Sequence, residues 1–382
     1  MSEHERPVYL DYNATTPHDP EVVEAMMPFL TTEFGNPSSS HVYGSEPRRA
    51  DEHARAQVAA LIGASAGEIV FTSGGTESNN YAILGTARAR SNRGRHIITS
   101  NIEHPAVLGT CAALENDGFE VTRIPVDGHG VVDPARLRDA LRGDTILVTV
   151  MMANNEIGTI EPIARIAELA HEHGAWIHTD AAQAVGKVPV SVDELGVDML
   201  TIAGHKLYAP KGVGALYLRD GVRPQLIMYG GSQERGLRPG TENVLEVVGL
   251  GAAAEVAQRD AGSISAAMRR SRDRLADAIA SECDVVVNGH PTERLPNTLN
   301  VSFRSIRSND LLAQIAADVA ASAGSACHAD SVTLSPVIAA VGTPPEYAPG
   351  TIRFSTGKPT TDDEIDRAAA AIVAAYRRLQ AE

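Results

Sequence analysis

Short apolar, β-branched runs alternate with amphipathic segments over the first two-thirds of this 382-residue chain. Several of these runs are apolar throughout, as expected for strands of a sheet that is covered on both faces. The alternation predicts an α/β fold with a mainly parallel sheet. The predicted strands are 68–72, 95–99, 120–126, 145–151, 175–179, 199–203 and 214–218. The predicted helices are roughly 46–62, 76–90, 105–117, 133–142 and 162–173.

The pattern changes near residue 260. A long Ala/Arg helical pattern at about 261–281 is followed by CDVVVNG, the strand pattern TLNVSF, a helix from about 308 and a last helix at about 361–380. Strands are sparser here and are mixed with helices, which predicts a second, smaller α+β domain. We expect a large domain of residues 15–260, and a small domain of residues 1–14 together with 261–382.

Net charge and hydropathy limit the partners. The chain carries 33 Lys and Arg against 48 Asp and Glu, a formal charge of −15, which disfavours direct binding to nucleic acid or to an anionic membrane. The N-terminal MSEHERPVYLDY lacks the features of a signal peptide, and no apolar run is long enough to span a bilayer. We therefore expect a cytoplasmic protein.

The three cysteines, Cys111, Cys283 and Cys327, are too widely spaced for a zinc ribbon or a disulfide framework. The sequences HEH at 171–173 and CH at 327–328 contain metal-ligand types. Without a second ligand cluster, solvated surface histidines are the better interpretation, and no metal is expected. Cys327 differs from the other two because it lies in SAGSACHAD, a run of small residues that is typical of a mobile segment rather than of a core.

Polar residues follow five of the predicted strands. SGGTESNN (73–80) follows the first strand, and SNIEH, MANNEIG, Asp180 and Gly-His-Lys follow four later ones. In an open parallel α/β sheet, ligands bind at the carboxyl ends of the strands. We therefore expect these five sets of side chains to share one site.

The residue types at these strand ends match one cofactor. SGGTES opens a helix and suits a phosphate, although a plain helix cap explains it as well. Asp180 suits a protonated pyridine nitrogen, although it too can act as a cap. Lys206 at a sheltered strand end suits a nucleophilic amine, and His104 suits stacking and proton transfer. Together they indicate a pyridoxal phosphate (PLP) site.

The chain resembles the NifS/IscS-type cysteine desulfurases, which are fold-type I PLP-dependent transferases with a mainly parallel seven-stranded sheet and a smaller domain. The resemblance covers nearly the whole chain. It is carried by YLDYNATTP (9–17), FGNPSS (34–39), VFTSGGTESNN (70–80), NNEIG (154–158), HTDAAQAVGK (178–187), AGHKLYAPKGVGALY (203–217), ERGLRPGTEN (234–243), SAGSAC (322–327) and TIRFSTG (351–357).

The resemblance implies a role for each matching residue. Lys206 would bind PLP covalently, and His104 would stack on its ring. The remaining cofactor contacts would be Asp180 to the pyridine nitrogen, Gln183 to the ring oxygen, Asn155 beside the ring, Gly75, Thr76 and His205 to the phosphate, and Thr241 to the phosphate of the partner subunit in a homodimer. Ala203 replaces a serine that is frequent in relatives, so one phosphate donor is missing here.

The resemblance also implies the reaction. Arg353 and Asn155 would bind L-cysteine, with Arg353 on its carboxylate. The Cys327 thiolate would take the sulfur as a persulfide, release L-alanine and pass the sulfur to an acceptor protein. His328 after this cysteine is more typical of desulfurases of DNA phosphorothioation systems than of the iron–sulfur branch.

Three alternatives stay open. The protein could donate sulfur for iron–sulfur cluster assembly, or it could be a selenocysteine lyase with the same fold and cofactor. A non-enzymatic sulfur carrier or scaffold is the third reading, although three distant cysteines exclude a self-contained Cys₄ cluster.

Overall fold

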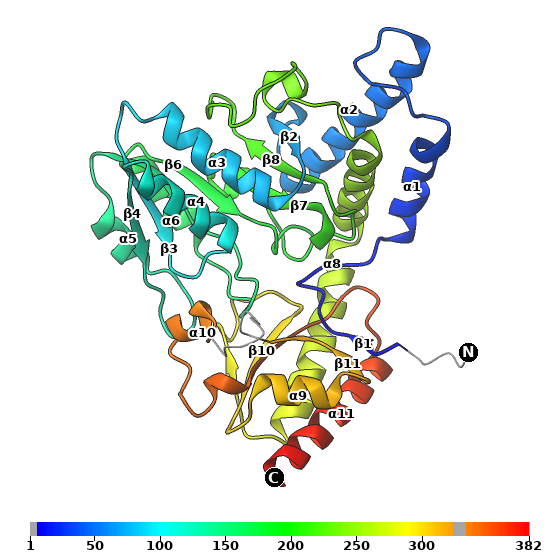
Figure 1. Ribbon diagram of the computed structural model, residues 1–382, viewed down its shortest axis with the longest axis vertical. Helices are drawn as coiled ribbons and strands as arrows, with labels where there is room; N and C mark the ends of the chain where they lie inside the picture. Colours follow the sequence, from blue (N-terminus) through cyan, green and yellow to red (C-terminus); the bar gives the residue numbers. More distant parts are fainter. Residues whose placement is uncertain (1–5, 324–333, 382) are drawn as a thin grey trace.

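The computed structural model describes residues 6–323 and 334–381. Its large sheet contains all seven predicted strands, in the order β2-β8-β7-β6-β5-β3-β4 (Figure 1). β3, β4, β5, β6 and β7 are parallel, whereas β8 is antiparallel to both of its neighbours. β2 therefore points the same way as the parallel strands. Their bounds are Ile69–Thr72 (β2), His96–Ser100 (β3), Glu120–Ile124 (β4), Thr145–Thr149 (β5), Trp176–Asp180 (β6), Met199–Ala203 (β7) and Gly214–Leu218 (β8).

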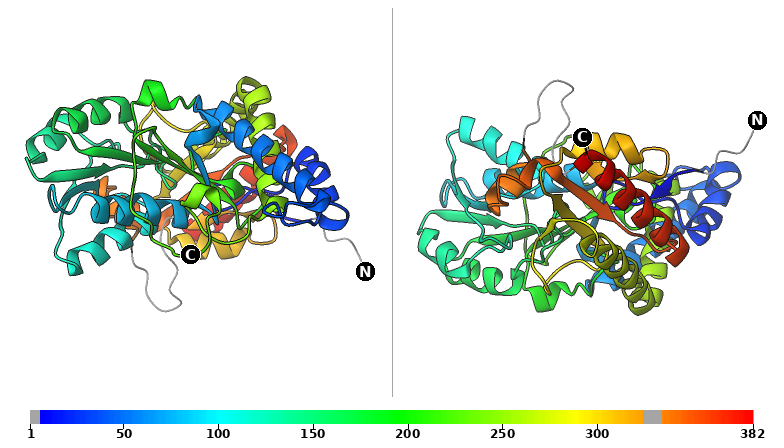
Figure 2. Two further views of the ribbon diagram at one scale, coloured as in Figure 1. Left: turned by 90° about the horizontal axis from the view of Figure 1, so that it is seen from above. Right: turned by 90° about the horizontal axis from the view of Figure 1, so that it is seen from below.

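Helices cover both faces of this sheet, which confirms the predicted α/β architecture (Figure 2). Alternate residues of one strand enter different cores: Val70 packs with α3 and α4, while Ile69 and Phe71 pack on the opposite side with α2, α5, α6, α7 and α8. This two-sided burial explains the apolar strand runs. The bounds are Pro20–Thr31 (α1), Val42–Ile62 (α2), Gly75–Ala89 (α3), Pro105–Asn116 (α4), Pro134–Ala140 (α5), Ile163–Glu172 (α6), Val192–Leu195 (α7) and Val244–Ala280 (α8).

A smaller four-stranded antiparallel sheet lies below the large one in Figure 1, in the order β12-β13-β10-β9. It packs with α9, α11 and the C-terminal part of α8 around a separate core. β1 (Val8–Tyr9) pairs with β11 (Val319–Ala320), and Leu10 is buried in the same core. The other bounds are Val285–Asn288 (β9), Thr298–Phe303 (β10), Ser322–Ala323 (β12), Thr351–Ser355 (β13), Ser308–Ile315 (α9), Pro336–Ala340 (α10) and Asp362–Ala381 (α11).

α8 corrects one expectation. The helix predicted at 261–281 begins at Val244 and runs unbroken past residue 260. Its N-terminal half packs closely on α2, because a Cβ at Gly251 would lie 2.6 Å from Ala54. The helix thus contributes to the core between the large sheet and α2 and to the core of the small sheet. The domain bounds 15–260 and 1–14 with 261–382 remain a prediction.

The N-terminal segment links the two sheets. The amide of Leu10 donates to Ala320 in the small part, and the amide of Thr16 donates to the carbonyl of His205 at the end of β7. Residues 11–15 therefore lie beside the carboxyl edge of the large sheet. No helix in the described ranges is long and apolar enough to cross a membrane.

Candidate active site

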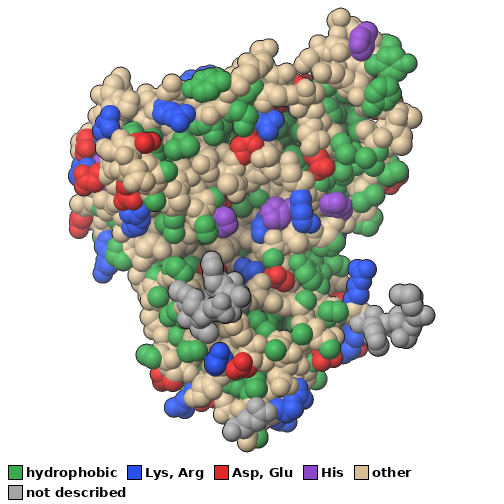
Figure 3. Space-filling model, viewed as in Figure 1, with side chains coloured by type: hydrophobic (Ala, Val, Ile, Leu, Met, Phe, Trp, Pro, Cys, Tyr) green, Lys and Arg blue, Asp and Glu red, His purple; other side chains and the backbone are tan. Residues whose placement is uncertain are grey.

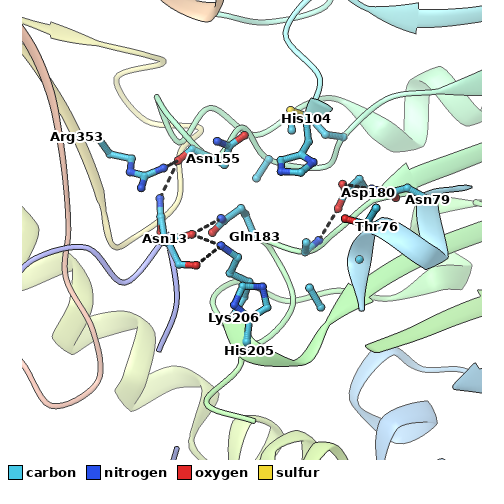
Figure 4. Close-up of a pocket in the computed structure, with 16 residues that line it drawn as sticks. Asn13, Thr76, Asn79, His104, Asn155, Asp180, Gln183, His205, Lys206 and Arg353 are labelled. Carbon is cyan, nitrogen blue, oxygen red and sulfur yellow. Dashed lines mark hydrogen bonds between the residues drawn. The ribbon is translucent and has the colours of Figure 1, made fainter. Parts of the chain in front are cut away.

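A cavity of about 290 Å³ lies at the carboxyl edge of the large sheet (Figure 4). Its walls come from the ends of β3, β5, β6 and β7, the first turn of α3, the N-terminal segment and β13. Nine of the eleven predicted site residues line it. The lining residues are Asn13, Ala14, Gly75, Thr76, Asn79, His104, Met151, Ala153, Asn155, Asp180, Ala182, Gln183, Ala203, His205, Lys206 and Arg353.

The N-terminus of α3 faces this cavity. Gly74 has a φ of 143°, a left-handed value that favours glycine. A Cβ at Gly75 would lie 3.4 Å from the Cβ of Ala203, so the first turn of α3 lies close to the end of β7. The free amides of a helix N-terminus favour an anion. His205 and Lys211 line an adjoining hollow beside this turn, so cationic or donor groups surround the expected phosphate position.

Asp180 ends β6, and only 6% of its surface is exposed. The Asn79 side chain donates to Oδ2 at 2.6 Å, and the amide of Ala182 donates to Oδ1 at 3.0 Å. These two donors hold the carboxylate in one orientation at the cavity wall (Figure 4). Asn79 lies on α3 and is itself 1% exposed, and no pattern in the sequence had singled it out.

Lys206 lies in the 3₁₀ turn Gly204–Lys206, directly after β7. Its ammonium donates to the carbonyl of Asn13 and, at 2.7 Å, to that of Ala14. Burial, followed by the charge of Arg353, lowers the Lys206 pKa to about 8, although Asp11 and Asp180 act in the opposite direction. An amine with this pKa is partly neutral near neutral pH, as a nucleophilic lysine requires.

His104 caps α4 and points into the cavity (Figure 4). Its Nδ1 accepts from the amide of Ala106 at 3.1 Å, and burial lowers its pKa below the usual value. The adjacent Glu103 is buried, accepts from Ser100 Oγ at 2.5 Å and from the amide of Met151, and has its pKa raised by burial to about 8. Glu103 thus fastens the β3–α4 turn to the end of β5 and fixes the position of His104.

Asn13 connects the cavity to both sheets, a role that no pattern in the sequence had indicated. Its side chain donates to Thr298 Oγ1 at 2.8 Å and to the carbonyl of Asn155 at 3.1 Å. Its own carbonyl accepts from Lys206 and from Gln183 Nε2. Asn13 therefore helps to hold the amine of Lys206 and the amide of Gln183 in position.

Lys187 is a second buried lysine behind the cavity, 4% exposed. Its ammonium donates to Gln183 Oε1 at 2.7 Å and to Asn13 Oδ1 at 3.3 Å. Burial lowers its pKa well below the usual value. Because Lys187 occupies the oxygen of the Gln183 amide, that amide must present its NH₂ group toward Asn13. Lys187 is the last residue of the HTDAAQAVGK motif. The only local sign of its contact with Gln183 was that the two residues are four positions apart.

Arg353 lies on β13 and is 9% exposed. Its Nη2 donates to Asp11 Oδ1 at 2.8 Å, and its Nη1 donates to the carbonyl of Asn155 at 3.0 Å. Its side chain reaches from the small sheet to the cavity beside Asn155 (Figure 4). His205 lies on the opposite wall. Its Nδ1 is 3.3 Å from Thr15 Oγ1, and burial lowers the pKa of His205 to about 4.

Thr241 is exposed and does not line the cavity of its own chain. Cys327 and His328 lie outside the described residues. Cys111 is buried in the core between the large sheet and α3 and α4, and Cys283 is buried in the core of the small sheet. Burial raises the pKa of Cys111 to about 12 and that of Cys283 to about 11.

Comparisons with known proteins identify the family of the chain. The aminotransferase class-V model matches residues 8–368. A cysteine desulfurase IscS from Methanosarcina thermophila is 48% identical over 368 residues, 96% of this chain and 91% of that protein. A solved NifS-like protein superposes with a TM-score of 0.92 at 37% identity, covering 98% of this chain and all of that one. A structure of SspA in complex with cysteine gives 0.83 at 38% identity, covering 92% and 99%. The chain therefore belongs to the aminotransferase class-V family and, within it, to the cysteine desulfurases of the IscS and NifS type.

Proposed function

We propose that this protein converts L-cysteine to L-alanine at the cavity described above, with PLP bound to Lys206, and transfers the sulfur to Cys327. The observation that carries the proposal is the convergence of three groups on one cavity: the amine of Lys206, the carboxylate of Asp180 and the guanidinium of Arg353. These groups suit an aldehyde, a pyridine nitrogen and an amino-acid carboxylate, respectively.

The residues that line the cavity can contact each part of PLP. The first turn of α3, with Gly75 and Thr76, would receive the phosphate together with His205. His104 would lie against the ring, and Gln183 and Asn155 would contact its edge. When bound, PLP supplies an electron sink conjugated with the amino group of the substrate.

Three residues would hold or transfer protons at this site. Asp180, held by Asn79 and Ala182, would keep a proton on the pyridine nitrogen. The amine of Lys206, with a pKa of about 8, would accept and return protons at the substrate. His104, whose pKa is lowered by burial, would be mainly neutral at neutral pH and available for the same task.

The substrate would be held by its carboxylate. Arg353 would bind the carboxylate, and Asn155 lies next to it. The Cys327 thiolate would then attack the substrate sulfur, forming an S–S bond as the C–S bond breaks. The electron pair of the broken bond stays with the substrate carbon, which takes a proton and leaves as alanine. The persulfide on Cys327 would pass to an acceptor protein.

We further propose a homodimer in which Thr241 reaches the phosphate of the partner subunit. Thr241 is exposed and outside the cavity of its own chain, as this arrangement requires. Exposed apolar side chains also gather over α1 and the start of α2 (Figure 3). A surface of this kind suits a subunit interface. These side chains are Val23, Met27, Leu30, Phe34, Val42 and Tyr43.

Borohydride reduction of the PLP-loaded protein, followed by peptide mass spectrometry, tests the cofactor assignment. The chain has four lysines, Lys187, Lys206, Lys211 and Lys358, so the result has few alternatives. We expect the label on Lys206, together with alanine formation from cysteine in the unreduced protein. A label on Lys187 or Lys211 would show that the cavity is assigned incorrectly.

For the pathway, co-purified proteins from the native host would separate an iron–sulfur acceptor from a DNA phosphorothioation acceptor.

A further inference from the structure

Arg353 is already bound by a carboxylate of its own chain. Its Nη2 donates to Asp11 Oδ1 at 2.8 Å, and the exposed fractions of the two side chains are 11% and 18%. Charged pairs that are largely screened from water interact more strongly than pairs at the surface. Asp11 therefore offsets part of the positive charge that a ligand carboxylate would meet.

The guanidinium of Arg353 retains one nitrogen without an acceptor among the described residues. Nη1 donates to the carbonyl of Asn155, whereas Nε is buried and has no hydrogen-bond partner within the described part of the chain. Buried donors without a partner are rare in proteins. A ligand carboxylate on Arg353 would thus share the guanidinium with Asp11.

Other charges around Arg353 are less direct. Glu156 is close enough to interact with it electrostatically, but its Oε2 accepts from Ser335 at 2.6 Å, and burial raises its pKa. Lys206 repels Arg353 across the cavity. Asp11 is the carboxylate that forms an ion pair with Arg353 among the described residues.

We propose that Asp11 is a positioning and affinity-setting residue that weakens the binding of carboxylate ligands at Arg353. This proposal rests on the proposed function, in which substrate and product carry the same α-carboxylate. A fully charged, unshared arginine would hold alanine as firmly as cysteine and would slow product release. Two carboxylates on one guanidinium repel each other, so Asp11 keeps the ligand exchangeable.

Asp11→Asn separates the charge of this residue from its position. The amide keeps the volume of the side chain and the Oδ1 acceptor, so Arg353 can remain in place while the negative charge is lost. Asp19→Asn is the matched control. Asp19 lies on the same N-terminal segment and pairs with Lys358 at 2.7 Å, but it does not line the cavity. Asp11→Ser, a smaller residue with an acceptor, serves if the asparagine variant does not fold.

The experiment measures calorimetric affinities of the PLP-loaded proteins for L-alanine and for L-alaninamide, which has the same amine but no carboxylate. We expect Asp11→Asn to bind alanine about tenfold more tightly than the unmodified protein, with no such gain for alaninamide and none for either ligand in Asp19→Asn. If the alaninamide affinities are too weak to measure, the change in alanine affinity decides alone.

An unchanged or weaker alanine affinity in Asp11→Asn would overturn the proposal. A loss would assign Asp11 to holding Arg353 in position, and no change would make its charge irrelevant to the ligand. Alanine formation from cysteine by the unmodified protein is assayed separately. Its absence would refute the proposed function, whereas the ratio of alanine to alaninamide affinities would still report on Asp11.

Discussion

Replacing Asn79 by alanine tests whether the orientation of Asp180 matters for catalysis. The bond between Asn79 Nδ2 and Asp180 Oδ2 is 2.6 Å long, and the two residues are 1% and 6% exposed. A buried hydrogen bond to a charged group contributes about 1.5–3 kcal/mol. Without it, the carboxylate keeps the amide of Ala182 as its other donor. If the whole contribution is used to hold Asp180 against the cofactor, alanine formation should fall about 10- to 150-fold.

Asn80→Ala provides the control for this experiment. Asn80 is the next residue on α3, but its side chain donates to the carbonyl of Thr76 at 2.9 Å in an exposed position. Both variants are assayed for kcat, for cofactor affinity and for thermal unfolding. We expect the loss of kcat only in Asn79→Ala. Equal activities of the two variants, with PLP bound in both, would refute the role given to the Asn79–Asp180 contact.

Two further predictions follow from the charged residues of the cavity. Uptake of PLP by the apoprotein should accelerate as the pH rises and level off above about 8, because the lowered pKa of Lys206 leaves its amine protonated below that value; stopped-flow absorbance between pH 6 and pH 9 measures it, and a flat profile would contradict the assignment. Arg353→Ala should weaken cysteine binding by roughly 2–4 kcal/mol, because a buried charged contact is lost. Steady-state KM measures that change, and an unchanged KM would mean that another cation binds the carboxylate.

The strands of the large sheet were predictable because burial on both faces determines the composition of each strand. Strands buried on both faces are rich in apolar and β-branched residues, so β5 and β7 are recognisable from composition alone. The predicted strand 145–151 ran two residues too far, because the amide of Met151 turns to bond Glu103 rather than continuing the ladder. The start of α8 was predicted too late, because the sequence does not show that the segment before residue 261 packs as a helix. Its Gly251 is a helix-packing residue against α2, a role that no local pattern reveals.

The site was predictable where its residues follow strands, as Asp180 and Lys206 do. Asn79, Lys187 and Asp11 were not assigned, because each acts through a partner distant in the sequence. Asn79 looks like an ordinary helical residue until α3 is packed over the end of β6. Lys187 and Asp11 lie inside motifs that carry the family resemblance, but their partners, Asn13 and Arg353, are identified only by the fold.

The transfer of sulfur to Cys327 is the central claim, and mass spectrometry of cysteine-treated protein tests it most directly. The unmodified chain should carry a persulfide on Cys327, and Cys327→Ser should yield neither persulfide nor alanine while its cofactor spectrum still responds to cysteine, because a serine hydroxyl is not ionised at neutral pH. Cys111→Ser and Cys283→Ser should change neither product, since burial raises the pKa values of both thiols to about 12 and about 11. A persulfide on Cys111 or Cys283, or undiminished alanine from Cys327→Ser, would contradict the account.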